Sequence, residues 1–453
     1  MVRIDLEQAR KRAKERVRAG ESATLAEAQR EVARGLGYAS WPRLVRAIGE
    51  RATAERIVQL AGDRGGLALE LLDAYPELRA DPWVALTLGD GSAVADAVAP
   101  DGPLAAPPLF YVARSRIARD TVAAAQALLG PGADPNAPGA ESWTNLSVAC
   151  SRGDAPLVAL LLAAGAEPND EDSLYHAVEP ADAACLRLLL AAGATVPGTV
   201  ALHHALDYER LEPVTLLLDA GGDPNEGADW PPLHHAVGRG RSPAFVRLLV
   251  ERGADVAARD RAGRTAYQHA VRRGDTALAE ALRELGSPTE LTDADRALAA
   301  IASGGAVAVT ELDAGAADML MELAMRDPAT LGRVVDAVGA DFRASWGGGP
   351  EGTLLHQAAW FGRAPLVELL LARGADPEAR ATTEYATPLG WTAVGSRYSP
   401  DHPDDSFSAP DADHLAVARL LVAAGARIEP KFVEMATSPL ATWLAEAGGG
   451  ERR

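Results

Sequence analysis

The stretch LVALLLAAGAEPN at residues 157–169 decides the fold, because variants of it return along the chain. In each, a Leu-rich run leads into a Gly and a short turn. The variants are VTLLLDAGGDPN at 214–225, FVRLLVERGADV at 245–256 and LVELLLARGADPE at 366–378. Gly165 follows Gly132 by 33 residues, and Gly253 follows Gly221 by 32. Repetition at this period predicts stacked helical units rather than one globular core.

A second short motif precedes most of these Leu-rich runs. It occurs as PPLFYV at 107–112, TNLSVA at 144–149, DSLYHA at 172–177, VALHHA at 200–205, PPLHHA at 231–236, TAYQHA at 265–270, TLLHQA at 353–358 and TPLGWT at 387–392. The two motifs together resemble those of ankyrin repeats, whose first helix opens with Thr-Pro-Leu-His-x-Ala. The resemblance covers about 104–290 and 350–428. It implies an all-α, ankyrin-type helical-repeat solenoid with short β-turn fingers and helical caps.

Five segments are expected along the chain. They are an N-terminal helical hairpin or cap at 1–50, degenerate helical repeats at 51–103, ankyrin repeats at 104–290, degenerate helical repeats at 291–349, and C-terminal ankyrin repeats with a terminal cap at 350–453. The hairpin is predicted to hold helices at 5–18 and 22–34, with Ser22 and Thr24 able to cap the second. An insertion at 396–413, rich in Asp, Ser and Pro, is expected to form a loop.

Composition narrows the class of protein. The 453 residues carry a formal net charge of −19, which disfavours general nucleic-acid binding. Two cysteines, Cys150 and Cys185, are too few for a disulfide framework. The charged N-terminus is not typical of a signal peptide, and no apolar run is long enough for a membrane helix. A cytoplasmic protein is therefore expected, and the order of its repeats resembles large bacterial ankyrin repeat proteins.

Motifs of catalytic and metal sites are missing from the sequence, which contains no GxxxxGK[ST], GxSxG, HExxH or CxxC. The histidines do cluster, at His203–His204, His234–His235, His269 and His356. The resemblance gives His203, His234 and His356 a structural role in the turns, whereas His204, His235 and His269 fall one position later. Adjacent helical side chains diverge by roughly 100° and do not easily share a metal. We expect a non-enzymatic protein without metal or cofactor.

The resemblance also implies that a partner protein binds in the concave groove, at the turns and the exposed end of each first helix. Arg and Trp, which dominate interface energetics, occupy several of the matching positions. The expected contact residues are Trp143, Arg152, Tyr208, Trp230, Arg239, Arg264, Arg272, Arg273, Trp360 and Phe361. Because Arg pairs with carboxylates and phosphates, the unidentified partner is expected to be acidic or phosphorylated at the contact.

Two other functions stay open. The groove could neutralise an enzyme or toxin by covering its active site. Alternatively, the basic stretch QARKRAKERVR at 8–18, together with the groove arginines, could contact nucleic acid. The negative net charge makes nucleic acid the weaker of these expectations, and no membrane contact is expected.

Overall fold

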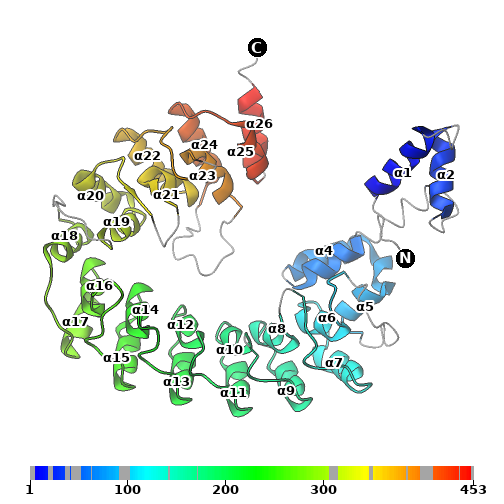
Figure 1. The fold of residues 1–453 in the computed structure, drawn as a ribbon, viewed down its shortest axis with the longest axis horizontal. Helices are drawn as coiled ribbons and strands as arrows, with labels where there is room; N and C mark the ends of the chain where they lie inside the picture. Colours follow the sequence, from blue (N-terminus) through cyan, green and yellow to red (C-terminus); the bar gives the residue numbers. More distant parts are fainter. Residues whose placement is uncertain are drawn as a thin grey trace. The chain divides into compact units, whose positions relative to one another are not determined.

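The computed structural model describes residues 6–18, 24–35, 41, 53–62, 64–90, 103–140, 143–170, 172–305, 315–345, 350–383, 386–397, 412–437 and 439–449. Within these ranges the chain is mostly helical (Figure 1). It divides into two compact units, Met1–Ala205 and Leu206–Arg453. The boundary lies inside the segment 104–290, and the five-segment division remains a prediction. Most of the predicted 396–413 loop lies outside the described residues.

Unit 1, Met1–Ala205, is built from short helices in antiparallel pairs. They are α1 (Leu6–Arg18), α2 (Leu25–Gly35), a helix at 53–62, α4 (Gly65–Ala74), the 3-10 helix η1 (Pro76–Ala80), α5 (Pro82–Thr87), α6 (Pro108–Arg114), α7 (Thr121–Leu129), α8 (Asn145–Ser151), α9 (Ala155–Ala163), α10 (Ser173–His176), α11 (Ala184–Ala191) and α12 (Ala201–Ala205). Helices α6, α8, α10 and α12 pack in succession, and α7, α9 and α11 form a second row. Thr24 accepts a hydrogen bond from Glu27 N, as expected of a cap on α2.

Unit 2, Leu206–Arg453, repeats the arrangement. Its elements are α13 (Leu211–Asp219), α14 (Pro232–Gly238), α15 (Pro243–Glu251), α16 (Ala266–Arg272), α17 (Thr276–Glu284), α18 (Asp293–Ala302), α19 (Ala316–Ala324), α20 (Pro328–Val338), β1 (Arg343–Ala344), β2 (Gly352–Thr353), α21 (Leu354–Trp360), α22 (Ala364–Ala372), α23 (Pro388–Gly395), α24 (His414–Ala423), α25 (Pro430–Met435) and α26 (Leu440–Gly449). Strands β1 and β2 pair antiparallel, with Arg343 opposite Thr353. Helix α18 packs on α16, and α20 packs on α22.

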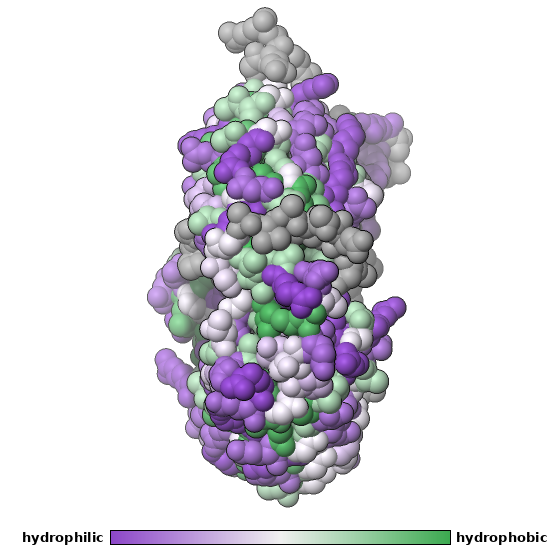
Figure 2. Space-filling model, turned by 90° about the vertical axis from the view of Figure 1, so that its left-hand side faces the viewer, coloured by the Kyte–Doolittle hydropathy of each residue, from purple (hydrophilic) through white to green (hydrophobic). Residues whose placement is uncertain are grey.

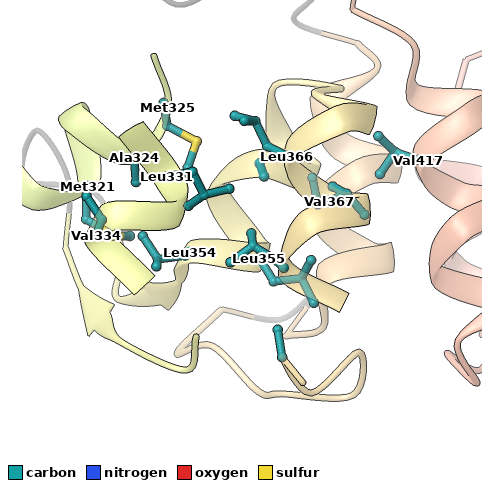
Figure 3. Packing of buried hydrophobic residues seen from close by; sticks show 14 of the residues in the cluster. Met321, Ala324, Met325, Leu331, Val334, Leu354, Leu355, Leu366, Val367 and Val417 are labelled. Carbon is teal, nitrogen blue, oxygen red and sulfur yellow. The ribbon is translucent and has the colours of Figure 1, made fainter. Parts of the chain in front are cut away.

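The leucine of the second motif is a core position. It is at most 5% exposed at Leu146, Leu174, Leu202, Leu233, Leu355 and Leu389. Tyr267, at the same place in TAYQHA, is only half-buried. Its longer ring ends in a hydroxyl that favours contact with water. Figure 3 shows how Leu331 and Val334 of α20 share a core with Leu354 and Leu355 of α21, so the segment without motifs packs against one that has them.

Threonine at the first position of the motif caps the first helix. The hydroxyl oxygens of Thr144, Thr265 and Thr353 each accept a hydrogen bond from a main-chain N–H three residues later, and the side chain there bonds back to the threonine N–H. Such capping boxes satisfy N–H groups that a helix start otherwise leaves unpaired. At the other end of the unit, Gly165 has a φ of 92°, a left-handed conformation typical of the glycine that follows a helix.

In three units, the asparagine that ends GADPN, GAEPN or GGDPN ties the unit to the next one. Asn136 donates through Nδ2 to Gly165 O at 2.9 Å and accepts from Glu167 N at 2.8 Å. Asn225 makes the same two bonds, to Gly253 O at 2.9 Å and from Asp255 N at 2.7 Å. Asn169 repeats the arrangement with Gly193 and Thr195. We call this pair of bonds the asparagine clamp.

On the face drawn in Figure 2, hydrophilic side chains are interspersed with short apolar stretches, as is usual for a protein surface in water. Among the helices that the structure describes, none combines the length and apolar character needed to cross a membrane.

Candidate protein-binding surface

The expected contact arginines of unit 2 are occupied by carboxylates of the chain itself. Arg239 Nε lies 2.6 Å from Asp207 Oδ1, and Arg273 Nη1 lies 2.5 Å from Glu322 Oε1. Arg264 Nε lies 3.6 Å from Asp260 Oδ2. All three side chains are partly buried. An acidic partner would therefore compete with internal carboxylates at these positions.

The position of Arg272 contradicts the prediction most clearly. It was predicted to face the groove, but it is 1% exposed and its guanidinium contacts the buried carboxylate of Asp295. The prediction of Arg272 as a partner contact is wrong, because α18 packs over α16 and closes that position. The sequence around α18 lacks the repeat motifs, so this cover could not be placed in register beforehand.

The aromatic residues expected in unit 2 are all half-buried rather than freely exposed. Tyr208 lies under the Arg210 guanidinium, 4.6 Å from ring centroid to Cζ. Trp230 meets His269 edge-to-face at 5.1 Å. Trp360 contacts Trp391 at 5.8 Å, and Phe361 packs against the hydrophobic core. Trp360 and Phe361 therefore contribute to packing, and their role in binding remains a prediction.

Unit 1 differs from unit 2, because two of the predicted contact residues line the same cavity there. Trp143 and Arg152 line a cavity of about 430 Å³, together with Phe110, Arg114 and Arg116. A second cavity of about 770 Å³ adjoins it and shares Leu104, Arg114 and Ala140 as lining residues. Arg56 and Arg64 line that second cavity. We call the two cavities together the arginine groove.

Neutral main-chain carbonyls hold the arginines at the centre of this groove. Arg114 Nη1 donates to Gln59 O at 2.9 Å, and Arg116 Nε donates to Gly62 O at 2.7 Å. Both acceptors belong to the last turn of helix 53–62, where carbonyls lack helical partners. Arg152 Nη1 donates to Ala113 O, and its nearest carboxylate, that of Asp154, is 3.8 Å away. The Arg116 side chain is thus oriented by a neutral acceptor, and that of Arg152 by a carbonyl together with a carboxylate 3.8 Å away.

Gly62 makes room for this arrangement. A Cβ built on Gly62 would stand 2.3 Å from Cζ of Arg114, far inside a normal contact. The guanidinium of Arg114 therefore occupies the space that any other residue at position 62 would need. The same glycine supplies the carbonyl for Arg116, so one position at the end of helix 53–62 places two cations.

The pKa of Arg152 reflects its surroundings. Burial lowers this pKa, the carboxylate of Asp154 raises it, and the neighbouring charge of Arg116 lowers it again. Asp154 is itself engaged at the start of α9, where it accepts from Leu157 N and from the Thr121 hydroxyl. Two guanidinium groups are therefore close enough to repel one another at the edge of the cavity.

An aromatic stack forms one wall of the same cavity. The ring of Trp143 lies on that of His176, with centroids 4.2 Å apart and planes at 22°. His176 Nδ1 lies 2.6 Å from Glu179 Oε1, and His204 Nε2 lies 3.3 Å from the same oxygen. Burial alone would raise the pKa of Glu179, but these two hydrogen bonds outweigh it and lower the pKa to about 2. The one described acidic residue lining the groove is thus an anion tied to histidines.

Comparison with known proteins agrees with the repeat pattern. Residues 109–226 and 202–293 match the family model for ankyrin repeats in three copies, and residues 352–382 match that of the single ankyrin repeat. The chain contains ankyrin repeats. No curated protein sequence matches it significantly.

Two solved ankyrin repeat domains are similar to parts of the chain. The human ASB11 ankyrin repeat domain is 26% identical, with 46% of this chain and 98% of that chain covered and a TM-score of 0.38. The ankyrin repeat domain of Bcl-3, a member of the IkappaB protein family, is 27% identical, with 47% and 88% covered and a TM-score of 0.34.

Within the ankyrin repeats, two motif histidines link neighbouring units. His234 Nε2 bonds to Arg264 O at 2.9 Å, and His356 Nε2 bonds to Ala386 O at 3.0 Å. Each acceptor directly precedes the next motif. The histidines one position later pair with carboxylates instead: His235 with Asp207 at 2.8 Å and His269 with Asp260 at 2.7 Å. These contacts give both sets a structural role.

Most residues of the arginine groove were not predicted from the sequence. Arg56 and Arg64 lie where the ankyrin motifs are absent, so no register related them to Trp143. Arg116 follows the end of α6 in the loop before α7, outside the positions that the repeat pattern singles out. The one available signal was local: Arg114, Arg116 and Arg119 stand close together in a chain with an excess of acidic residues.

Proposed function

We propose that this protein is a non-catalytic scaffold that binds another protein along the concave groove of its ankyrin repeats. Ankyrin repeat domains generally mediate protein–protein interaction. The observation that carries the proposal for this chain is the meeting of Trp143 and Arg152 in one open cavity with further arginines. Trp and Arg are the residue types that contribute most at protein interfaces.

The partner is acidic or phosphorylated where it meets this surface. The chain as a whole is strongly negative, so a local concentration of arginines attracts anionic groups while the remaining surface repels them. A surface built on packed helices is ordered before binding, which lowers the entropic cost of association. The two cysteines are free and buried, and we place the scaffold in a reducing cytoplasm.

Affinity capture tests this function. The immobilised full chain is incubated with lysate of its native host, and retained proteins are identified by mass spectrometry. We expect Trp143→Ala to lose the partner, because truncating an aromatic interface anchor typically costs about 2 kcal/mol or more. Tyr75→Ala is the matched control, since Tyr75 is an exposed aromatic residue of the same unit that does not line either cavity. Equal retention by both variants would contradict the proposal.

Neutralisation of an enzyme or toxin would use the same surface and would be recognised by inhibition of the captured partner. Nucleic-acid binding remains the alternative function. Helix α1 carries the exposed cations Lys11, Arg12, Lys14 and Arg18. If the chain retains nucleic acid rather than protein, and this retention falls steeply with salt concentration, the nucleic-acid function is favoured.

A further inference from the structure

We propose that the arginine groove of unit 1 is the docking site for an extended acidic segment of the partner, with an apolar residue of that segment seated against Trp143. The inference rests on the proposed function and gives it a location and a ligand chemistry. It assigns binding roles to Arg56, Arg64, Arg114 and Arg116.

The first argument is the balance of charge. Five arginines line the two cavities: Arg56, Arg64, Arg114, Arg116 and Arg152. No acidic residue is found among the described residues that line the larger cavity, and Glu179 is the single one lining the smaller. Because Glu179 bonds to His176 and His204, its charge is already partly balanced. The described lining residues of the groove thus hold more cations than anions, in a chain of net charge −19.

The second argument is preorganisation. Arg116 and Arg152 each donate to a main-chain carbonyl, which orients the side chain without neutralising it. A guanidinium carries five N–H donors, so each arginine keeps several for an incoming anion. Less side-chain entropy is lost on binding than with freely rotating surface arginines.

The third argument is the contrast within the chain. In unit 2, Arg239 and Arg273 lie within 2.6 Å of carboxylate oxygens, and an acidic ligand would have to break those pairs. In unit 1, the nearest carboxylate to Arg152 is 3.8 Å away, and no carboxylate pairs with Arg116 among the described residues. The gain in free energy from a new ion pair is therefore greater in unit 1.

The fourth argument is shape. The cavities share Leu104, Arg114 and Ala140, so a ligand can run continuously from Arg56 to Arg152. An extended peptide advances about 3.3 Å per residue and presents side chains alternately to two sides. Acidic side chains can then reach the arginines while an apolar neighbour meets Trp143, Phe110 and Leu104.

Fluorescence anisotropy on the full chain at low salt tests the proposal. The probes are a labelled peptide alternating Glu and Gly around a central Leu, the same peptide with phosphoserine for Glu, the same peptide with Lys for Glu, and a labelled DNA duplex. We expect both anionic peptides to bind and the Lys peptide not to bind. The tighter of the two anionic peptides identifies carboxylate or phosphate as the preferred group. Stronger binding of the duplex than of either peptide would overturn the inference in favour of nucleic acid.

Matched variants locate the site. We expect Arg116→Gln with Arg152→Gln to weaken binding about tenfold or more, because two charge-assisted contacts are lost. Arg247→Gln with Arg283→Gln changes the net charge equally at exposed positions of unit 2 and should leave binding unchanged. Equal affinities of the two double variants would overturn the location.

Gly62→Ala keeps every charge and provides a second, independent test. Its methyl group would enter the space of the Arg114 guanidinium and displace it. We expect weaker peptide binding with an unchanged far-ultraviolet circular dichroism spectrum, and parental affinity would contradict the proposed geometry. If the parent captures a protein from lysate but binds neither anionic peptide, this inference fails and the scaffold function stands.

Discussion

Arg272 donates a hydrogen bond from Nε to Oδ1 of Asp295, and both side chains are buried although they belong to different helices. Asp295 also accepts from Thr292 N at 2.7 Å and from Gln268 Nε2 at 3.2 Å through its other oxygen. Burial would raise the pKa of Asp295, but its hydrogen bonds and Arg272 together lower it. One ionised carboxylate thus joins α16 to the start of α18.

Asp295→Ala should lower the free energy of unfolding by about 3–5 kcal/mol, because it leaves a buried guanidinium without its carboxylate. Urea unfolding followed by circular dichroism measures the loss. The double variant Arg272→Met, Asp295→Leu should recover much of it, since no unpaired buried charge remains. A loss below about 1 kcal/mol in the single variant would show that Arg272 escapes to solvent.

The asparagine clamp should stabilise the contact between repeats. Asn225→Ala removes both bonds to the turn at Gly253 and Asp255, and we expect the free energy of unfolding to fall by about 1–2 kcal/mol. Asn225→Asp keeps the acceptor and loses the donor, so its loss should be intermediate. Urea unfolding at constant pH measures both variants, and a larger loss for Asp than for Ala would contradict the clamp.

His356 should make stability depend on pH. Burial lowers its pKa in the folded state to about 4, whereas an unfolded histidine has a pKa of about 6.5. A lowered folded-state pKa means that the unfolded chain binds the proton first as pH falls. Stability is therefore complete above about pH 6.5 and is lost progressively towards pH 4, by up to about 3 kcal/mol for this residue.

Comparison with His356→Gln isolates this effect, because glutamine does not titrate. The variant should show a smaller decrease in the free energy of unfolding between about pH 7 and pH 4.5 than the parent. Parallel pH profiles of the two proteins would exclude His356 as a source of acid sensitivity.

Two glycines should respond oppositely to alanine. Gly165→Ala should cost about 1 kcal/mol, because the φ of 92° is unfavourable for any residue with a Cβ. Gly66 lies in helix α4, and a Cβ there meets nothing within 4 Å, so Gly66→Ala should gain about 0.5–1 kcal/mol. Thermal unfolding followed by circular dichroism measures both. Stabilisation by Gly165→Ala would contradict its role as a helix cap.

The repeat pattern predicts what recurs in each unit and little of what occurs once. The turn contact of His356 was predicted correctly, because the motif histidine meets the same kind of acceptor in successive repeats. The buried Leu233 and the capping Thr265 also recur with the motif. The partner of Arg272 was not predictable, since Asp295 lies in a segment without motifs. Likewise, the carbonyl of Gly62 meets Arg116 across 54 residues, and no period relates the two.

The internal ion pair of Arg239 was predictable from the repeat period. Its partner Asp207 lies 32 residues earlier, one repeat length, next to the expected contact residue Tyr208. An acidic residue one period before a groove arginine is therefore a signal that the arginine is neutralised internally. Under this rule, Arg239 is a weaker candidate for contact with an acidic partner than the arginines of unit 1.

The asparagine clamp also affects how readily a repeat can be added to such a chain by duplication. In the following turn, Asn136, Asn169 and Asn225 bond to main-chain atoms, so they recognise no particular side chain there. A duplicated unit could be inserted beside any of them without compensating substitutions. The series is interrupted at Pro197 and ends at Ala257, because these residues take the equivalent position and have no side-chain amide. Duplication of a clamped unit therefore preserves this contact, whereas duplication next to Pro197 or Ala257 adds no clamp.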